Sequence, residues 1–78
     1  MDNADHKEVT IYVNGQPKVW TKMDISYAEI VELAFPGSSK QYTVTYSEGD
    51  HEKQLVPSSK PVHVREGMEF DVDETSNS

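Results

Sequence analysis

A single helical pattern, set between stretches of alternating residues, limits the possible folds of this chain more than any other feature. Ser26 and Glu29 have the spacing of a capping box, in which each side chain satisfies a backbone N–H group of the first helical turn. The apolar residues of one buried face follow at i, i+3, i+4 and i+7 spacing, namely Tyr27, Ile30, Val31 and Ala34. Pro36-Gly37 ends the pattern, because proline disfavours helical conformation in the residue before it. The sequence therefore predicts one short amphipathic helix.

A hairpin is predicted before this helix. Residues Glu8–Val13 alternate between the two faces of a strand, and Asn14-Gly15 follows at once, which is the strongest short signal for a type I′ turn. A two-residue turn places Trp20 on the core face and Val19 outside. A one-residue bulge would instead set Val19 against Ile11 and turn Trp20 to solvent. We favour the first register, because a thin core needs the area of its only tryptophan.

Four further strands complete the expected order. They are the second strand of the hairpin at Lys18–Thr21, a strand at Gln41–Tyr46, a short strand around Leu55 within His51–Val56, and a last strand over Met68, Phe70 and Val72. A hairpin, one helix and three more strands can bury only one layer against another. If the last strand pairs beside the first, the helix lies across the sheet. The sequence therefore predicts an α+β protein with the β-grasp (ubiquitin-like) fold, in which one helix packs across a mixed five-stranded sheet. Residues 8–72 form this domain, between tails at 1–7 and 73–78.

The composition of the chain argues against several classes of function. Because the formal charge is −7, we expect neither nucleic acid nor anionic membranes as partners. There are 0 cysteines, which excludes disulfides and thiol catalysis and fits the cytoplasm. His6, His51 and His63 lie in poorly structured or edge segments, and Glu48, Asp50, His51 and Glu52 form a solvated acidic turn rather than a metal site. We expect a protein that is not an enzyme, holds no cofactor and acts through other proteins.

Four segments together resemble a known family. They are VTIYVNGQP at 9–17, MDISYAEIVELAFP at 23–36, YTVTY at 42–46 and REGMEFDV at 65–72, and they resemble the bacterial ubiquitin-like domains of the multiubiquitin family. The resemblance implies a protein modifier. An E1-like enzyme would activate its C-terminal carboxylate with ATP, and an E2-like enzyme would pass it to target proteins. A JAB-type or other peptidase would process it, and the pathway would act against phage. Members of the family often carry tandem copies, whereas this sequence has one copy.

The resemblance makes the end of the chain a candidate conjugation tail, at Thr75, Ser76, Asn77 and Ser78. Six residues from Asp73 onward could reach roughly 20 Å from the last strand, and small side chains keep such a tail slender. The tail reads DETSNS and has no Gly-Gly pair. The reactive carboxylate would belong to Ser78, or to an earlier residue after trimming.

The alternative function is a non-covalent protein-interaction module. The predicted register leaves two apolar residues, Tyr12 and Val19, on the outer face of the sheet, together with Thr43 and Thr45. Exposed apolar groups on a small domain can mark an interface, although scattered surface apolar residues with no role are equally common. Deleting residues 73–78 would separate the two functions, since a recognition module would keep its partner.

Overall fold

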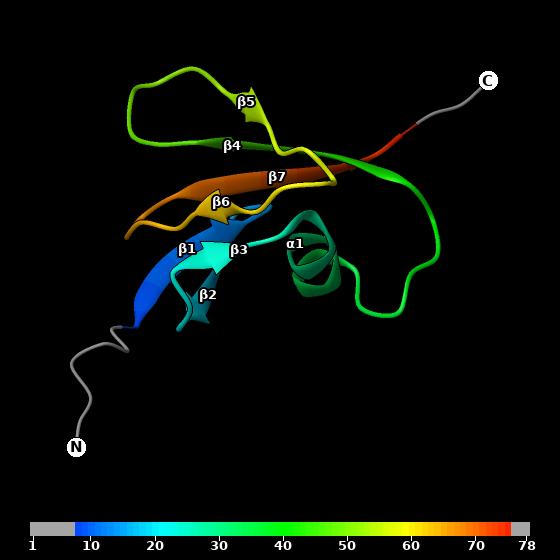
Figure 1. Cartoon of the computed structure of the whole chain (residues 1–78), viewed down its shortest axis with the longest axis horizontal. Coiled ribbons are helices and arrows are strands. Elements are labelled where there is room, and N and C mark those ends of the chain that lie inside the picture. Colours follow the sequence, from blue (N-terminus) through cyan, green and yellow to red (C-terminus); the bar gives the residue numbers. More distant parts are fainter. Residues whose placement is uncertain (1–7, 76–78) are drawn as a thin grey trace.

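The computed structural model describes residues 8–75, and the predicted tails at 1–7 and 76–78 lie outside this range (Figure 1). The elements in chain order are β1 (Val9–Val13), β2 (Gln16–Trp20), β3 (Asp24–Ile25), α1 (Tyr27–Ala34), β4 (Tyr42–Ser47), β5 (Gln54–Leu55), β6 (Val62–His63) and β7 (Glu69–Glu74). No helix among the described residues has the length and apolar character needed to cross a bilayer.

The main sheet confirms the predicted architecture. Its five strands lie in the order β2-β1-β7-β4-β5, with β1 and β7 parallel and the other neighbours antiparallel. Helix α1 contacts β1, β4 and β7, so it packs across one face of the sheet (Figure 1). Because the last strand pairs with the first, the helix is brought over the middle of the sheet. The protein therefore has the β-grasp fold.

The hairpin has the predicted register. Val9 pairs with Trp20 and Thr10 pairs with Val19, as a two-residue turn requires. Both turn residues have positive φ, +52° at Asn14 and +82° at Gly15. Trp20 is half-buried against the core, and its indole N–H donates a hydrogen bond to the backbone oxygen of Asp24 at 3.0 Å. The only tryptophan thus lies on the core face, as predicted.

The helix begins and ends at the predicted signals. The Glu29 N–H donates to Ser26 Oγ at 3.1 Å, and the Ser26 N–H donates to Glu29 Oε1 at 2.9 Å, which completes the capping box. Ile30 is fully buried, while Val31 and Ala34 are half-buried against the core. Phe35 is the C-cap residue, directly before Pro36. Local sequence therefore sets both ends of the helix.

The core consists of residues from the helix, the strands and adjoining segments that pack between the helix and the main sheet. The buried members are Ile11, Val13, Ile25, Ile30, Tyr42, Val44, Val56, Val64, Met68, Phe70 and Val72. In β4 and β7 they occupy alternate positions, so the residues between them point to the opposite face. That opposite face holds the predicted interaction residues.

The strands differ from the sequence prediction in three main respects. Strand β2 starts at Gln16 and includes Pro17. Proline has no backbone N–H to donate, but β2 is an edge strand, and backbone positions on its outer side need no partner. A second, two-stranded sheet joins β3 to β6 through pairs such as Ile25 with Val62. Strand β7 continues to Glu74, because β4 offers it partners beyond Val72. Strand β7 therefore runs two residues past Val72, where the sequence prediction ended the last strand.

Two polar side chains form hydrogen bonds with backbone groups of strand residues at positions where no neighbouring strand is present. The Tyr27 hydroxyl donates to the backbone oxygen of Tyr42 and accepts from the Tyr42 N–H at 3.2 Å. At the other side of the sheet, the Val72 N–H donates to Asn14 Oδ1 at 2.8 Å, and Asn14 Nδ2 donates to the Val72 oxygen at 3.3 Å. Each side chain replaces a missing strand residue, so these backbone groups stay paired.

Candidate functional site

The four predicted interaction residues share one face of the main sheet. Tyr12 and Val19 alternate with buried positions on β1 and β2, and Thr43 and Thr45 alternate with buried Tyr42 and Val44 on β4. Helix α1 lies on the other face (Figure 1). The exposed fractions of Tyr12 and Val19 are 37% and 60%. We call this surface the outer face.

Strand β7 divides the predicted residues into two groups. It lies between β1 and β4, and its outward residues are Glu69, Asp71 and Asp73. Glu69 pairs with Tyr12 on one side, and Asp71 and Asp73 pair with Thr45 and Thr43 on the other. The outer face therefore has a central row of carboxylates, with Tyr12 and Val19 at one margin. The four residues do not form a continuous apolar patch.

These carboxylates were not predicted as part of the site. The signal was present, because acidic residues alternate with Phe70 and Val72 in the last strand, and a period of two places them on one face. Leu55 was not predicted as a member of this face either; it pairs with Thr45 and has an exposed fraction of 68%. The outer face thus carries exposed apolar side chains at both margins.

One lysine neutralises part of this acidic row. Lys53 Nζ lies 2.6 Å from Asp71 Oδ2. The pKa of Lys53 is raised, first by its hydrogen bond to Asp71 and the charge of that carboxylate, and further by the charges of Asp73 and Glu69. All three carboxylates therefore act at the position of the Lys53 amine.

The first residue of the predicted conjugation tail is bound to the sheet. The Thr75 N–H donates to the Gln41 oxygen at 2.9 Å, and Thr75 Oγ1 lies 2.8 Å from Thr43 Oγ1. Glu74, directly before it, forms an ion pair with Lys40 at 3.5 Å. Thr75 therefore continues the pairing of β7 with the chain before β4, and it touches one of the predicted interaction residues. Ser76, Asn77 and Ser78 lie outside the described residues.

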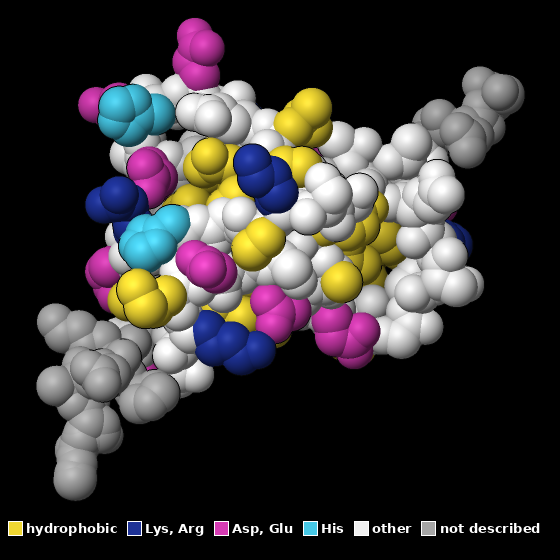
Figure 2. Space-filling model, viewed as in Figure 1, with side chains coloured by type: hydrophobic (Ala, Val, Ile, Leu, Met, Phe, Trp, Pro, Cys, Tyr) yellow, Lys and Arg dark blue, Asp and Glu magenta, His cyan; other side chains and the backbone are white. Residues whose placement is uncertain are grey.

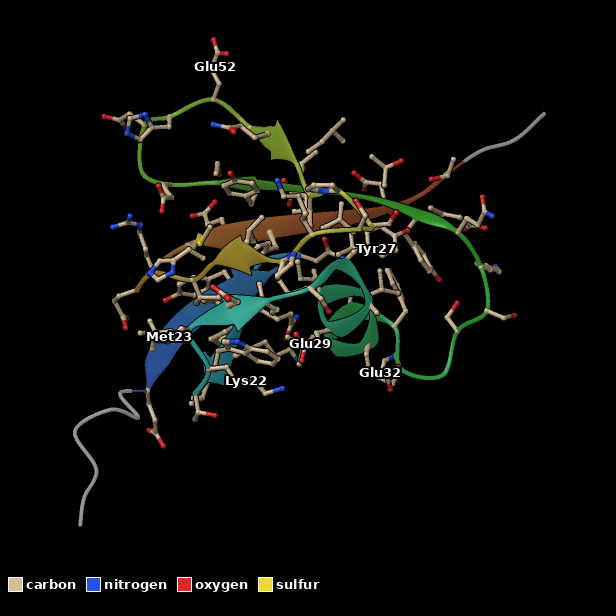
Figure 3. The ribbon with its side chains drawn as sticks, in the orientation of Figure 1. Lys22, Met23, Tyr27, Glu29, Glu32 and Glu52 are labelled. Atoms are coloured by element: carbon tan, nitrogen blue, oxygen red, sulfur yellow. The ribbon has the colours of Figure 1, made fainter. Side chains whose placement is uncertain are left out.

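The acidic turn does not form a cluster suited to a metal. Within residues 8–75, no group of three or more His, Asp or Glu side chains could hold an ion. Glu48 instead accepts from Arg65 Nε at 3.1 Å. Figure 3 shows Glu52 projecting from the loop between β4 and β5, far from Glu29 on the helix.

Comparison with known proteins identifies the family. No curated protein and no solved structure matches the chain. The family model described as Multiubiquitin matches residues 9–76, which include all strands and the helix. This match agrees with the β-grasp topology, in which parallel β1 and β7 lie side by side at the centre of the sheet. The chain belongs to the Multiubiquitin family.

Proposed function

We propose that this protein is a ubiquitin-like modifier in a bacterial conjugation pathway directed against phage. An E1-like enzyme activates its C-terminal carboxylate with ATP, an E2-like enzyme carries it, and the carboxylate is joined to an amine of a target protein. A JAB-type or other peptidase trims or removes it. The cytoplasm, where ATP is available, is the proposed compartment.

The observation that carries this proposal is the extent of the family match. It runs to residue 76, so it includes all of β7 and continues beyond the sheet into the candidate tail. Strand β7 is central in the sheet, which fixes the point where the chain leaves the domain. Glu74 and Thr75 at this point are exposed. A last strand that is held in the middle of the sheet and ends in exposed residues suits a protein whose terminus is handled by other enzymes.

The chemistry needs no catalytic residue in this chain. The C-terminal carboxylate attacks the α-phosphorus of ATP, which forms an acyl adenylate and releases pyrophosphate. A thiol of the activating enzyme displaces AMP to form a thioester, and a thiol of the conjugating enzyme then takes over the acyl group. A target amine attacks the thioester, forms an amide and releases the thiol. The contribution of this protein is to present its terminus and to be recognised.

The contacts of Thr75 narrow the candidate tail. Because its N–H and hydroxyl groups bond to Gln41 and Thr43, Thr75 belongs to the end of the sheet as long as these bonds hold. The proposed reactive carboxylate therefore belongs to Ser78, or to Asn77 or Ser76 after trimming. Thr75 itself could react only after its two bonds to the sheet have broken.

Incubation with the activating enzyme and ATP tests the proposal. Intact-mass spectrometry should detect a C-terminal adenylate or a thioester with the enzyme, and addition of the conjugating enzyme should yield a conjugate. A variant that ends at Glu74 is the matched control, because it keeps the whole of β7 and removes all four candidate residues. This variant should fold and should not be conjugated.

Two outcomes would contradict the proposal at different points. If the protein of residues 1–78 forms neither adenylate, thioester nor conjugate with its enzymes, it is not a modifier of this type. If the variant ending at Glu74 is conjugated as efficiently as the protein of residues 1–78, the modifier function stands but the candidate tail is wrong. Circular dichroism of both proteins establishes that loss of conjugation does not reflect unfolding.

A further inference from the structure

The outer face carries three of the five large apolar side chains that are exposed among the described residues. The exposed fractions are 37% at Tyr12 and 60% at Val19 on one margin, and 68% at Leu55 on the other. By strand register these side chains lie on the same face as the carboxylates of β7. A folded chain of this size has few large apolar residues to bury, so leaving three of them on one sheet face favours a partner that covers them.

The central row of carboxylates on β7 favours a partner that is positively charged. Glu69, Asp71 and Asp73 occupy alternate positions of one strand, so neighbouring carboxylates are about 7 Å apart along β7. Among residues 8–75, only Asp71 of the three has a basic partner, Lys53. The other two carboxylates can accept hydrogen bonds from outside the molecule.

The protein already holds one ammonium group at this row. The Lys53 amine lies 2.6 Å from Asp71, and the charges of Asp71, Asp73 and Glu69 all favour its protonated form, which raises the pKa of Lys53. Lys53 is on the loop that leads into β5, at the margin of the sheet, and its side chain is 62% exposed. A cation from another protein can therefore replace it without disturbing the core.

We infer that the outer face binds a segment of another protein that presents two basic side chains about 7 Å apart, with apolar residues beside them. The basic side chains pair with Asp71 and Asp73 or Glu69, and the apolar residues cover Tyr12, Val19 and Leu55. Lys53 competes with the partner for Asp71. This docking needs no activated C terminus, so it goes beyond the proposed conjugation.

Charge excludes other occupants of this face. A second copy placed face to face would bring the same three carboxylates against one another, which is repulsive. Nucleic acid would be repelled in the same way, since its phosphates and these carboxylates are both negative. A basic protein segment is the occupant whose charge complements the row.

A peptide titration tests the inference. The probe is a synthetic amphipathic helix with arginines at i and i+4, about 6 Å apart along its axis, and leucines beside them on the same face. The control probe has glutamine in place of arginine. Amide chemical shifts of the labelled protein, followed at low and high salt, should change most in β1, β4 and β7, and the arginine probe should bind more weakly at high salt.

Variants with equal changes in net charge distinguish an effect of the outer face on binding from an effect of the protein's overall charge. Lys53→Gln removes the internal competitor and should tighten binding of the arginine probe about two- to five-fold, the range expected for an exposed ion pair. Lys60→Gln makes the same change in net charge in a loop outside the sheet and should leave binding unchanged. Asp73→Asn should weaken binding by a similar factor, whereas Asp50→Asn should not.

Several results would overturn the inference. One is equal tightening by Lys53→Gln and Lys60→Gln, which would mean that only net charge matters. Another is that the largest amide chemical-shift changes occur on the helix side of the protein, where Lys22, Met23 and Glu29 lie near one another (Figure 3). Figure 2 shows that acidic and basic side chains are interspersed on this helix side. Equal binding of the glutamine probe, or no binding of either probe, would also contradict the inference.

Discussion

Replacing Asn14 by glycine should loosen β7 from the β1 side of the sheet. Asn14 lies just past the end of β1, where its carboxamide both accepts from the Val72 N–H at 2.8 Å and donates to the Val72 oxygen at 3.3 Å. Its φ of +52° is in the left-handed region, which glycine adopts without strain. The substitution Asn14→Gly therefore removes the carboxamide and keeps the turn.

The expected loss of stability follows from these two hydrogen bonds. Each bond contributes a net 0.5–1.5 kcal/mol in typical proteins, so the loss should be about 1–3 kcal/mol. A domain of this size has a total free energy of unfolding of roughly 3–5 kcal/mol, so this loss is a large share. Asn14→Ala should cost about 1 kcal/mol more than Asn14→Gly, because alanine is strained at positive φ.

Urea unfolding, followed by the fluorescence of Trp20, measures the free energy of unfolding. Hydrogen exchange locates the effect, because the Val72 amide should lose protection relative to the Val56 amide, which donates to the Val44 oxygen elsewhere in the sheet. If Asn14→Gly stays within the roughly 0.5 kcal/mol of a neutral surface substitution and Val72 remains protected, the proposed role of the carboxamide is wrong.

Three further substitutions test other contacts. Tyr27→Phe removes the hydroxyl that pairs both backbone groups of Tyr42, and urea unfolding should show a loss of about 1–3 kcal/mol. Ile30→Ala opens a cavity at a fully buried position and should cost about 2–5 kcal/mol, so that circular dichroism detects a large unfolded fraction. The pKa of Glu29 is lowered, mainly by its hydrogen bond to Lys22, from an ordinary value of 4.5. The unfolded chain therefore binds more protons at Glu29 than the folded chain does. The contribution of Glu29 to stability is present above pH 4.5 and is lost as the pH falls through its folded-state pKa. The variant Glu29→Gln should therefore show a smaller drop in the urea midpoint over that pH interval.

The elements that could be predicted from the sequence depend on neighbouring residues. The hairpin register follows from the Asn14-Gly15 turn, since a two-residue loop fixes the pairing of the strands on either side. The helix start follows from Ser26 and Glu29, which satisfy each other's backbone groups within one turn. Alternation in β4 correctly separated Thr43 and Thr45 from the buried positions. All these signals act within a few residues.

Other features could not be predicted because they depend on distant partners. Strand β7 reaches Glu74 only because β4 still offers Tyr42 as a partner there. The two-residue strands β3 and β6 have no pattern of their own and form where their segments meet beside the helix. The placement of the four outward residues on one face could be predicted, but the carboxylate row between them was missed. Its position follows from placing β7 between β1 and β4.

The sequence by itself determined the elements of this protein, because turn chemistry, capping and hydrophobic period are properties of short segments. It also determined the net charge of −7. The tertiary structure alone decided where the charge is concentrated and where the domain ends. Central placement of β7 brings Glu69, Asp71 and Asp73 between two apolar margins, and pairing with the chain before β4 binds Thr75 to the sheet. Both depend on contacts between residues more than 20 positions apart, which no local pattern encodes.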